Sequence, residues 1–115
     1  LDPFKSNQAG VINASPLCMG LLTASACPSW HPYEKKQALH EKIQLLAKEN
    51  ISIEKQSIQY ALNQDYFSST LIGLSNIDEL IEIIKWKDNL HEPKIIHYVQ
   101  DILWPFKDIS WDSTL

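Results

Sequence analysis

Apolar residues recur with two different periods along the chain, and each period predicts one kind of element. Spacings of three and four residues predict four amphipathic helices. We expect these helices at residues 33–50, at 53–64, from about 77 onward, and from 93 to just before Pro105. Two short runs rich in β-branched residues, closed by a Ser-Pro corner or a glycine, predict strands at residues 10–15 and 69–72.

Two of the predicted helices carry recognisable start signals. Ser52 is a suitable N-cap for the second helix, and Ser75 or Asn76 can cap the third. Ser75 and Asp78 also approximate a capping box, in which an N-cap and the residue three positions later bond reciprocally. The apolar stripe that predicts the third helix consists of Ile77, Leu80, Ile81 and Ile84.

The order of the elements is strand, two helices, strand, two helices. Two strands separated by tens of helical residues are typical of a parallel crossover. Because a two-stranded parallel sheet leaves its apolar faces uncovered, we expect the missing sheet to come from outside this chain or from a partner. Short apolar strands of this kind are typical of α/β barrels. The sequence therefore predicts an α/β fold that is incomplete in these 115 residues.

Composition narrows the classes of function. The chain has a formal net charge of −4, and its ten basic residues are scattered, so no face gathers the positive charge that nucleic acid requires. No apolar run approaches the ~20 residues of a membrane span, and the N-terminus lacks the apolar region of a signal peptide. We therefore expect a cytoplasmic protein without nucleic-acid or membrane partners, with Cys18 and Cys27 as free thiols. Because the chain does not begin with Met, we expect its numbering to start inside a longer protein.

Both predicted strands are followed by residues suited to binding an anion. After the first strand, Ser15 offers a hydroxyl, Pro16 fixes a turn, and the amides of residues 17–20 can face a ligand. After the second strand, Gly73 permits close approach, and the helix from Ile77 presents free amides and its positive dipole end. Ligands of α/β folds bind beyond the carboxyl ends of strands. Each motif is also an ordinary turn or helix start, so a purely structural interpretation stays open.

Other conspicuous side chains favour structural roles. Cys27 and His31 have the spacing of half a zinc site, but no second ligand pair follows. Tyr60 and Tyr98 fall within predicted helices instead of at strand ends, so neither is expected to be a catalytic phenol. The four tryptophans accompany no basic groove and are expected to pack in loops and in the tail.

Three motifs follow one another in a fixed order. They are GVINASPLCMGLL from Gly10, WHP from Trp30, and STLIGLSNIDELIE from Ser69. Together with the helix ending QYAL they resemble the carboxyl-terminal part of the aldo-keto reductases, in particular the L-galactose dehydrogenase-like branch. The resemblance covers about residues 10–84 and continues more loosely to Trp111. It implies a (β/α)₈ TIM barrel, of which residues 1–115 would supply the last two βα units and the tail helix as a partial NADP-dependent oxidoreductase type domain.

The resemblance also implies a nicotinamide dinucleotide site at the two strand ends. Its residues would be Ser15, Pro16, Leu17, Gly73, Ser75, Glu79 and Glu82. The first three would line the pyrophosphate and the nicotinamide ribose, Gly73 and Ser75 would contact the adenosine phosphate and ribose, and Glu82 would accept from adenine. Glu79 stands where relatives usually have Gln or Arg. Because this loop carries carboxylates and no cation, a 2′-phosphate would meet like charge, and we predict that NAD is preferred over NADP.

The resemblance implies that the complete enzyme transfers hydride between the nicotinamide and a small carbonyl or alcohol substrate, such as a sugar-like alcohol or an aldehyde. The catalytic Tyr, Lys, His and Asp of such enzymes lie on earlier strands, and no segment here matches those motifs. We therefore assign no catalytic residue and no metal ligand, and whether the chain alone is an enzyme stays open. The alternative is a truncated, catalytically inactive fragment that acts at most as a binding or interaction module. In isolation, its uncovered apolar faces are expected to cause association or aggregation.

Overall fold

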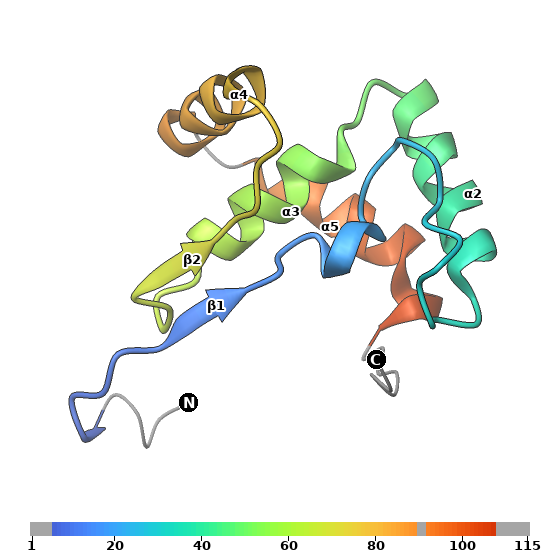
Figure 1. Cartoon of the computed structure of the whole chain (residues 1–115). Coiled ribbons are helices and arrows are strands. Elements are labelled where there is room, and N and C mark those ends of the chain that lie inside the picture. Colours follow the sequence, from blue (N-terminus) through green and yellow to red (C-terminus); the bar gives the residue numbers. More distant parts are fainter. Residues whose placement is uncertain (1–5, 90–91, 108–115) are drawn as a thin grey trace.

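The computed structural model describes residues 6–89 and 92–107 (Figure 1). The strands are β1 (Ile12–Ala14) and β2 (Ser69–Leu71). The helices are α2 (Lys36–Lys48), α3 (Ile53–Leu62), α4 (Ile77–Asp88) and α5 (Pro93–Ile102), with short 3-10 turns η1 (Cys18–Gly20) and η2 (Trp104–Phe106). The expected helices and strands are thus confirmed, with slightly shorter ends. The tail around Trp111, where the family resemblance is loosest, lies outside the described residues.

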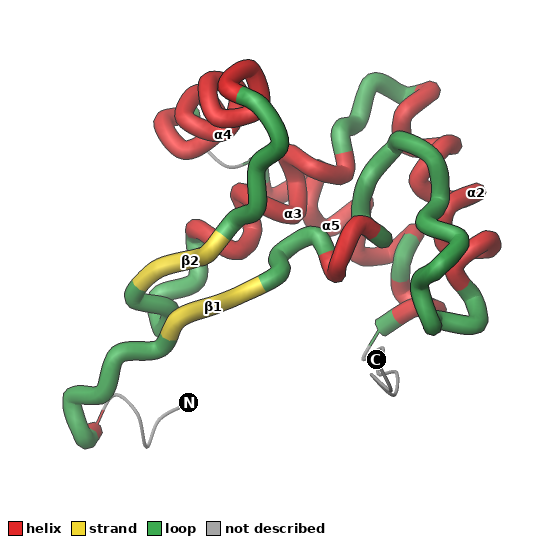
Figure 2. Tube along the Cα trace, in the orientation of Figure 1, coloured by secondary structure: helices red, strands yellow, loops and turns green. Residues whose placement is uncertain are grey.

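The two strands pair in parallel, as their helical connection predicted. The paired residues are Ile12 with Ser69, Asn13 with Thr70, and Ala14 with Leu71. Figure 2 shows that this small sheet is surrounded by much more helix and loop than strand. The described part of the chain is therefore mixed α/β, mostly helical, with a two-stranded parallel sheet.

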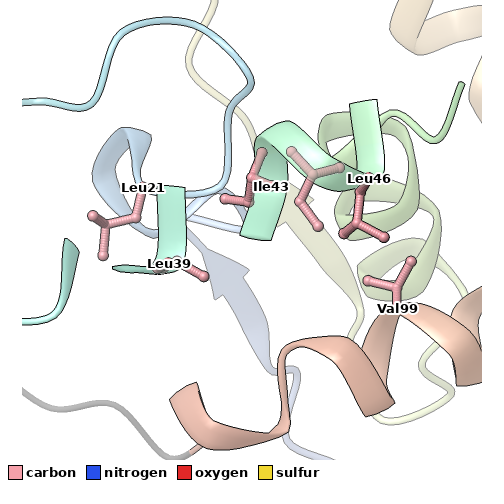
Figure 3. Close-up of a cluster of buried hydrophobic side chains, with 6 residues drawn as sticks. Leu21, Leu39, Ile43, Leu46 and Val99 are labelled. Atoms are coloured by element: carbon pink, nitrogen blue, oxygen red, sulfur yellow. The ribbon is translucent and has the colours of Figure 1, made fainter. Parts of the chain in front are cut away.

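The main hydrophobic cluster lies among the helices and the loop after η1. Its buried members are Leu21, Leu39, Ile43, Leu46, Ile53 and Val99 (Figure 3). Leu39, Ile43 and Leu46 form the inner face of α2 that the sequence period predicted. Val99 reaches them from α5, and Leu21 comes from the loop. Helices α2, α3 and α5 therefore share a core with the loop after η1, to one side of the sheet.

Helix α4 stands apart from this cluster (Figure 1). It is attached to α3, where the Gln59 Nε2 donates to the Trp86 carbonyl at 3.1 Å. None of its described side chains is buried. The apolar stripe that predicted the helix is exposed to solvent. The exposed fractions are 71, 40, 47 and 50% for Ile77, Leu80, Ile81 and Ile84. The period predicted the helix correctly, but within this chain the stripe has no covering element.

The sheet is uncovered in the same way. Ile12 of β1 is 62% exposed and Leu71 of β2 is 61% exposed. This confirms the expectation that apolar faces of the strands remain open, while association of the chain stays a prediction. Among residues 6–89 and 92–107, no helix is both long and apolar enough to cross a membrane.

Asn50 ends α2 in the left-handed conformation, with φ of 61°. The Ile51 N–H donates to the Leu46 carbonyl and the Asn50 N–H to the Ala47 carbonyl, both at 3.0 Å, a pattern typical of a Schellman cap. We expect Asn50→Val to lower the free energy of unfolding by about 1–2 kcal/mol, because a β-branched residue is strained at this φ. Asn50→Gly is the matched control and should be neutral or slightly stabilising. Urea unfolding compares the two, and equal losses would contradict the cap.

Candidate functional site

The carboxyl ends of β1 and β2 lie at one edge of the sheet (Figure 1). Because Ala14 pairs with Leu71, the chain leaves both strands at the same level, and neighbouring strands are about 4.8 Å apart. Residues 15–17 and 73–75 therefore begin side by side. The structure brings together the two motifs that the sequence singled out.

The segment after β1 forms a tight left-handed turn. Ser15, Cys18 and Met19 have φ values of 56°, 52° and 57°, and Gly20 has 91°. The Cys18 N–H donates to the Ser15 carbonyl at 2.9 Å, and the Gly20 N–H donates to the Leu17 carbonyl at 3.1 Å. The expectation that these two amides are free to face an anion is wrong, because carbonyls of the turn accept from them. The Ser15 side chain is exposed, and its hydroxyl remains available at the edge of the sheet.

An open groove of about 860 Å³ begins at this turn and continues between α3 and α5. Ser15 and Pro16 lie on its lining, together with side chains of both helices. Gln56 of α3 also lines it, is 8% exposed, and has no hydrogen-bond partner for its Oε1. Residues 72–89, which follow β2 directly and include α4, do not line the groove. The two halves of the candidate site therefore share a sheet edge but not a cavity in this chain.

The start of α4 is held by a carboxylate. Asn76 is the N-cap, and its Oδ1 accepts from the Glu79 N–H at 3.0 Å. Glu79 reaches back: its Oε2 accepts from the Ser75 N–H at 2.9 Å and its Oε1 from the Ser75 hydroxyl at 2.8 Å. The expected capping box of Ser75 and Asp78 is therefore wrong. The N-cap is Asn76, and the residue three positions after it is Glu79. The Ser75 groups expected to meet a phosphate are bonded to Glu79.

These contacts hold the pKa of Glu79 below its ordinary value of 4.5. The main cause is the hydrogen bond from the Ser75 N–H, followed by that from the Ser75 hydroxyl. A carboxyl with a depressed folded-state pKa stabilises the fold above its unfolded pKa. That stabilisation is lost as the pH falls through the lower, folded-state pKa.

We therefore expect Glu79→Gln to reduce stability at pH 7, with the difference from wild type fading as the pH falls below about 4.5. Urea unfolding of both proteins at pH 7 and at pH 3 measures this. Glu82→Gln, three residues further along the same helix, is the control: its carboxylate lies 3.4 Å from the exposed Lys85 ammonium, so the substitution should cost less stability at pH 7. A Glu79→Gln deficit of equal size at both pH values would contradict the assigned hydrogen bonds.

Gly73 and Glu82 are in open surroundings. A Cβ on Gly73 would meet nothing within 4 Å, so packing within this chain does not require glycine there. Glu82 is exposed on α4, and its Oε1 lies 3.4 Å from the Lys85 ammonium. Because Glu79 and Glu82 are three residues apart, they lie on the same side of the helix. The sheet edge beside β2 is therefore an accessible, acidic surface.

His31 is the residue whose environment the sequence did not predict. It is 1% exposed, its Nε2 lies 3.2 Å from the Cys18 carbonyl oxygen, and its Nδ1 accepts from the Tyr33 N–H at 3.1 Å. The sequence singled out His31 as half a zinc site and as part of the WHP motif. In the described part of the chain no three metal-binding side chains gather, and Cys18 and Cys27 are free thiols. The WHP motif was the feature of the sequence that could have drawn attention to His31. It does not predict burial, because apolar residues in a loop have no regular spacing.

Comparison with known proteins gives one informative relation. No family model matches the chain. The chain is similar to L-galactose dehydrogenase of Arabidopsis thaliana, with 35% identity over 119 residues. The similarity covers 98% of this chain but 37% of that protein, so the chain spans little more than a third of the length of the curated relative it matches. This agrees with the aldo-keto reductase-like relation that the motifs predicted.

Proposed function

We propose that residues 1–115 form the carboxyl-terminal, cofactor-binding part of a (β/α)₈ barrel of the aldo-keto reductase type. The complete protein would transfer hydride between a nicotinamide dinucleotide and a small carbonyl or alcohol, such as a sugar-like alcohol or aldehyde. The observation that carries the proposal is the meeting of the two strand-end motifs at one edge of a parallel sheet. The 35% identity to a dehydrogenase supports it.

Uncovered surfaces support the barrel. In a barrel every strand has a neighbour on both sides, and helices cover the outside of the sheet. In the described residues β1 and β2 pair only with each other, and the apolar stripe of α4 faces outward. The groove with the unpartnered Gln56 oxygen is a third open surface. Further strands and helices of a barrel would cover such surfaces.

The residues at the sheet edge fit one form of the cofactor better than the other. Glu79 already places a carboxylate on the Ser75 N–H and hydroxyl, at 2.9 and 2.8 Å. A 2′-phosphate here would be repelled by that charge, whereas a carboxylate accepts well from ribose hydroxyls. We therefore assign Glu79 to the adenosine ribose of NAD, and Ser15 with Pro16 and Leu17 to the pyrophosphate side.

The dinucleotide, when bound, supplies the hydride chemistry. The described residues hold and orient it: Ser15 donates a hydroxyl hydrogen bond at the end of β1, and Glu79 accepts at the start of α4. Glu82 offers a second acceptor for adenine on the same side of the helix. The catalytic acid and base are proposed to belong to other strands of the barrel. A truncated interaction module is less favoured, because the similarity to the dehydrogenase runs through 98% of the chain.

A pair of serine substitutions tests the proposal in the full natural protein that carries this sequence. Calorimetry with NADH should show saturable binding by the wild type. Ser15→Ala should weaken it about tenfold, because one hydrogen bond to a charged group is lost. Ser29→Ala removes an exposed hydroxyl from the loop before α2 and should leave binding unchanged. Equal affinities of the wild type and both variants would contradict the assignment of Ser15.

A further inference from the structure

The turn after β1 is strained, and the strain lies beside the proposed pyrophosphate position. Ser15, Cys18 and Met19 are not glycines, yet all three have φ between 52° and 57°. Left-handed backbone costs free energy for such residues, and it persists only where the surroundings hold it in place. Something in the structure must therefore fix this turn.

The His31 ring holds the middle of the strained turn. Its Nε2 lies 3.2 Å from the Cys18 carbonyl oxygen, which belongs to the peptide unit between Cys18 and Met19. The same carbonyl also accepts from the Leu21 N–H, at 3.3 Å. The contact joins a side chain in the loop before α2 to a backbone group thirteen residues earlier.

The neighbours of His31 determine which nitrogen donates. Because the Tyr33 N–H donates to Nδ1 at 3.1 Å, Nδ1 carries no proton and the neutral ring carries its proton on Nε2. Nε2 is then the donor to the Cys18 carbonyl. The Lys36 ammonium donates to the His31 carbonyl at 2.7 Å, and the Trp30 ring lies beside the imidazole at a centroid distance of 5.5 Å. Ring and loop are thus fixed from several sides.

We propose that His31 is a positioning residue of the dinucleotide site. It holds the Cys18 carbonyl, and thereby keeps the turn in the shape that presents Ser15 and Pro16 at the end of β1. This inference rests on the proposed function. At 1% exposure the ring does not reach a ligand itself, so its effect passes through the backbone of the turn.

Two substitutions separate the roles of the two ring nitrogens. The amide NH₂ of His31→Gln can take the place of Nε2 and donate to the Cys18 carbonyl. The amide oxygen of His31→Asn can take the place of Nδ1 and accept from the Tyr33 N–H, but the donor to Cys18 is lost. In the full natural protein, calorimetry with NADH should show the Kd raised about tenfold by Asn and restored to within about threefold of wild type by Gln. Melting temperatures of both variants are measured alongside.

Equal Kd values for His31→Gln and His31→Asn overturn the inference, whether both equal the wild-type value or both are raised. The two substitutions would have the same effect if the role of His31 were purely structural. A wild type that binds neither NADH nor NADPH refutes the proposed function itself, and is recognised before any variant is compared. If His31→Asn does not fold, nitrogen-15 NMR of the wild-type histidine rings decides. The His31 proton must lie on Nε2 and its signal must shift when NADH is added; a proton on Nδ1, or no shift, overturns the inference.

Discussion

Replacing Glu79 with arginine should reverse the cofactor preference of the full natural protein, lowering the KM for NADPH about tenfold and raising that for NADH. In the structure the Glu79 carboxylate accepts from the Ser75 N–H and hydroxyl at the start of α4, so a 2′-phosphate bound there would meet like charge. Arginine removes this acceptor for the ribose hydroxyls. It also adds a planar cation that binds a 2′-phosphate through paired hydrogen bonds.

A charge-matched control separates this local effect from a general change in net charge. Glu41→Arg makes the same change on an exposed position of α2, on the opposite side of the molecule from α4 (Figure 1). It should leave both KM values nearly unchanged. If Glu79→Arg does not improve the use of NADPH, or if Glu41→Arg improves it equally, Glu79 does not determine the preference.

Leu46→Ala should lower the free energy of unfolding by about 2–5 kcal/mol. Leu46 is 1% exposed and lies in the cluster where α2 meets α5 (Figure 3). Truncation removes buried methyl groups and leaves a cavity that the neighbouring side chains fill only in part.

The neighbouring leucine provides the control. Leu45 lies on the same helix and is 53% exposed, so Leu45→Ala makes the same chemical change with little loss of burial. We expect a cost below about 1 kcal/mol, measured by urea unfolding under the same conditions. Similar losses for both substitutions would mean that this cluster does not stabilise the fold.

The hydrophobic pattern predicted the elements of the fold well. The inner face of α2 with Leu39, Ile43 and Leu46 followed from spacing alone, because burial of one helical face imposes that spacing. The same spacing predicted α4, but its stripe stays exposed. The spacing of apolar residues shows that one face of a helix is suited to burial. It does not show which element covers that face.

The candidate site was predictable only in outline. Parallel strands place their carboxyl ends together, so the meeting of residues 15–17 with residues 73–75 followed from topology. The hydrogen bonds could not be read in advance. The internal bonds of the turn, the bonds of Glu79 to Ser75 and the burial of His31 all depend on loop geometry, which no regular spacing of residues in the sequence records. The roles of the seven cofactor residues and the preference for NAD stay predictions.

Binding of NADH and NADPH by the full natural protein, measured by calorimetric titration, tests most directly whether the two strand ends form a dinucleotide site. We expect saturable binding with one site per chain, and tighter binding of NADH than of NADPH. Absence of binding by both dinucleotides would contradict the site itself, and tighter binding of NADPH would contradict the role of Glu79 within it.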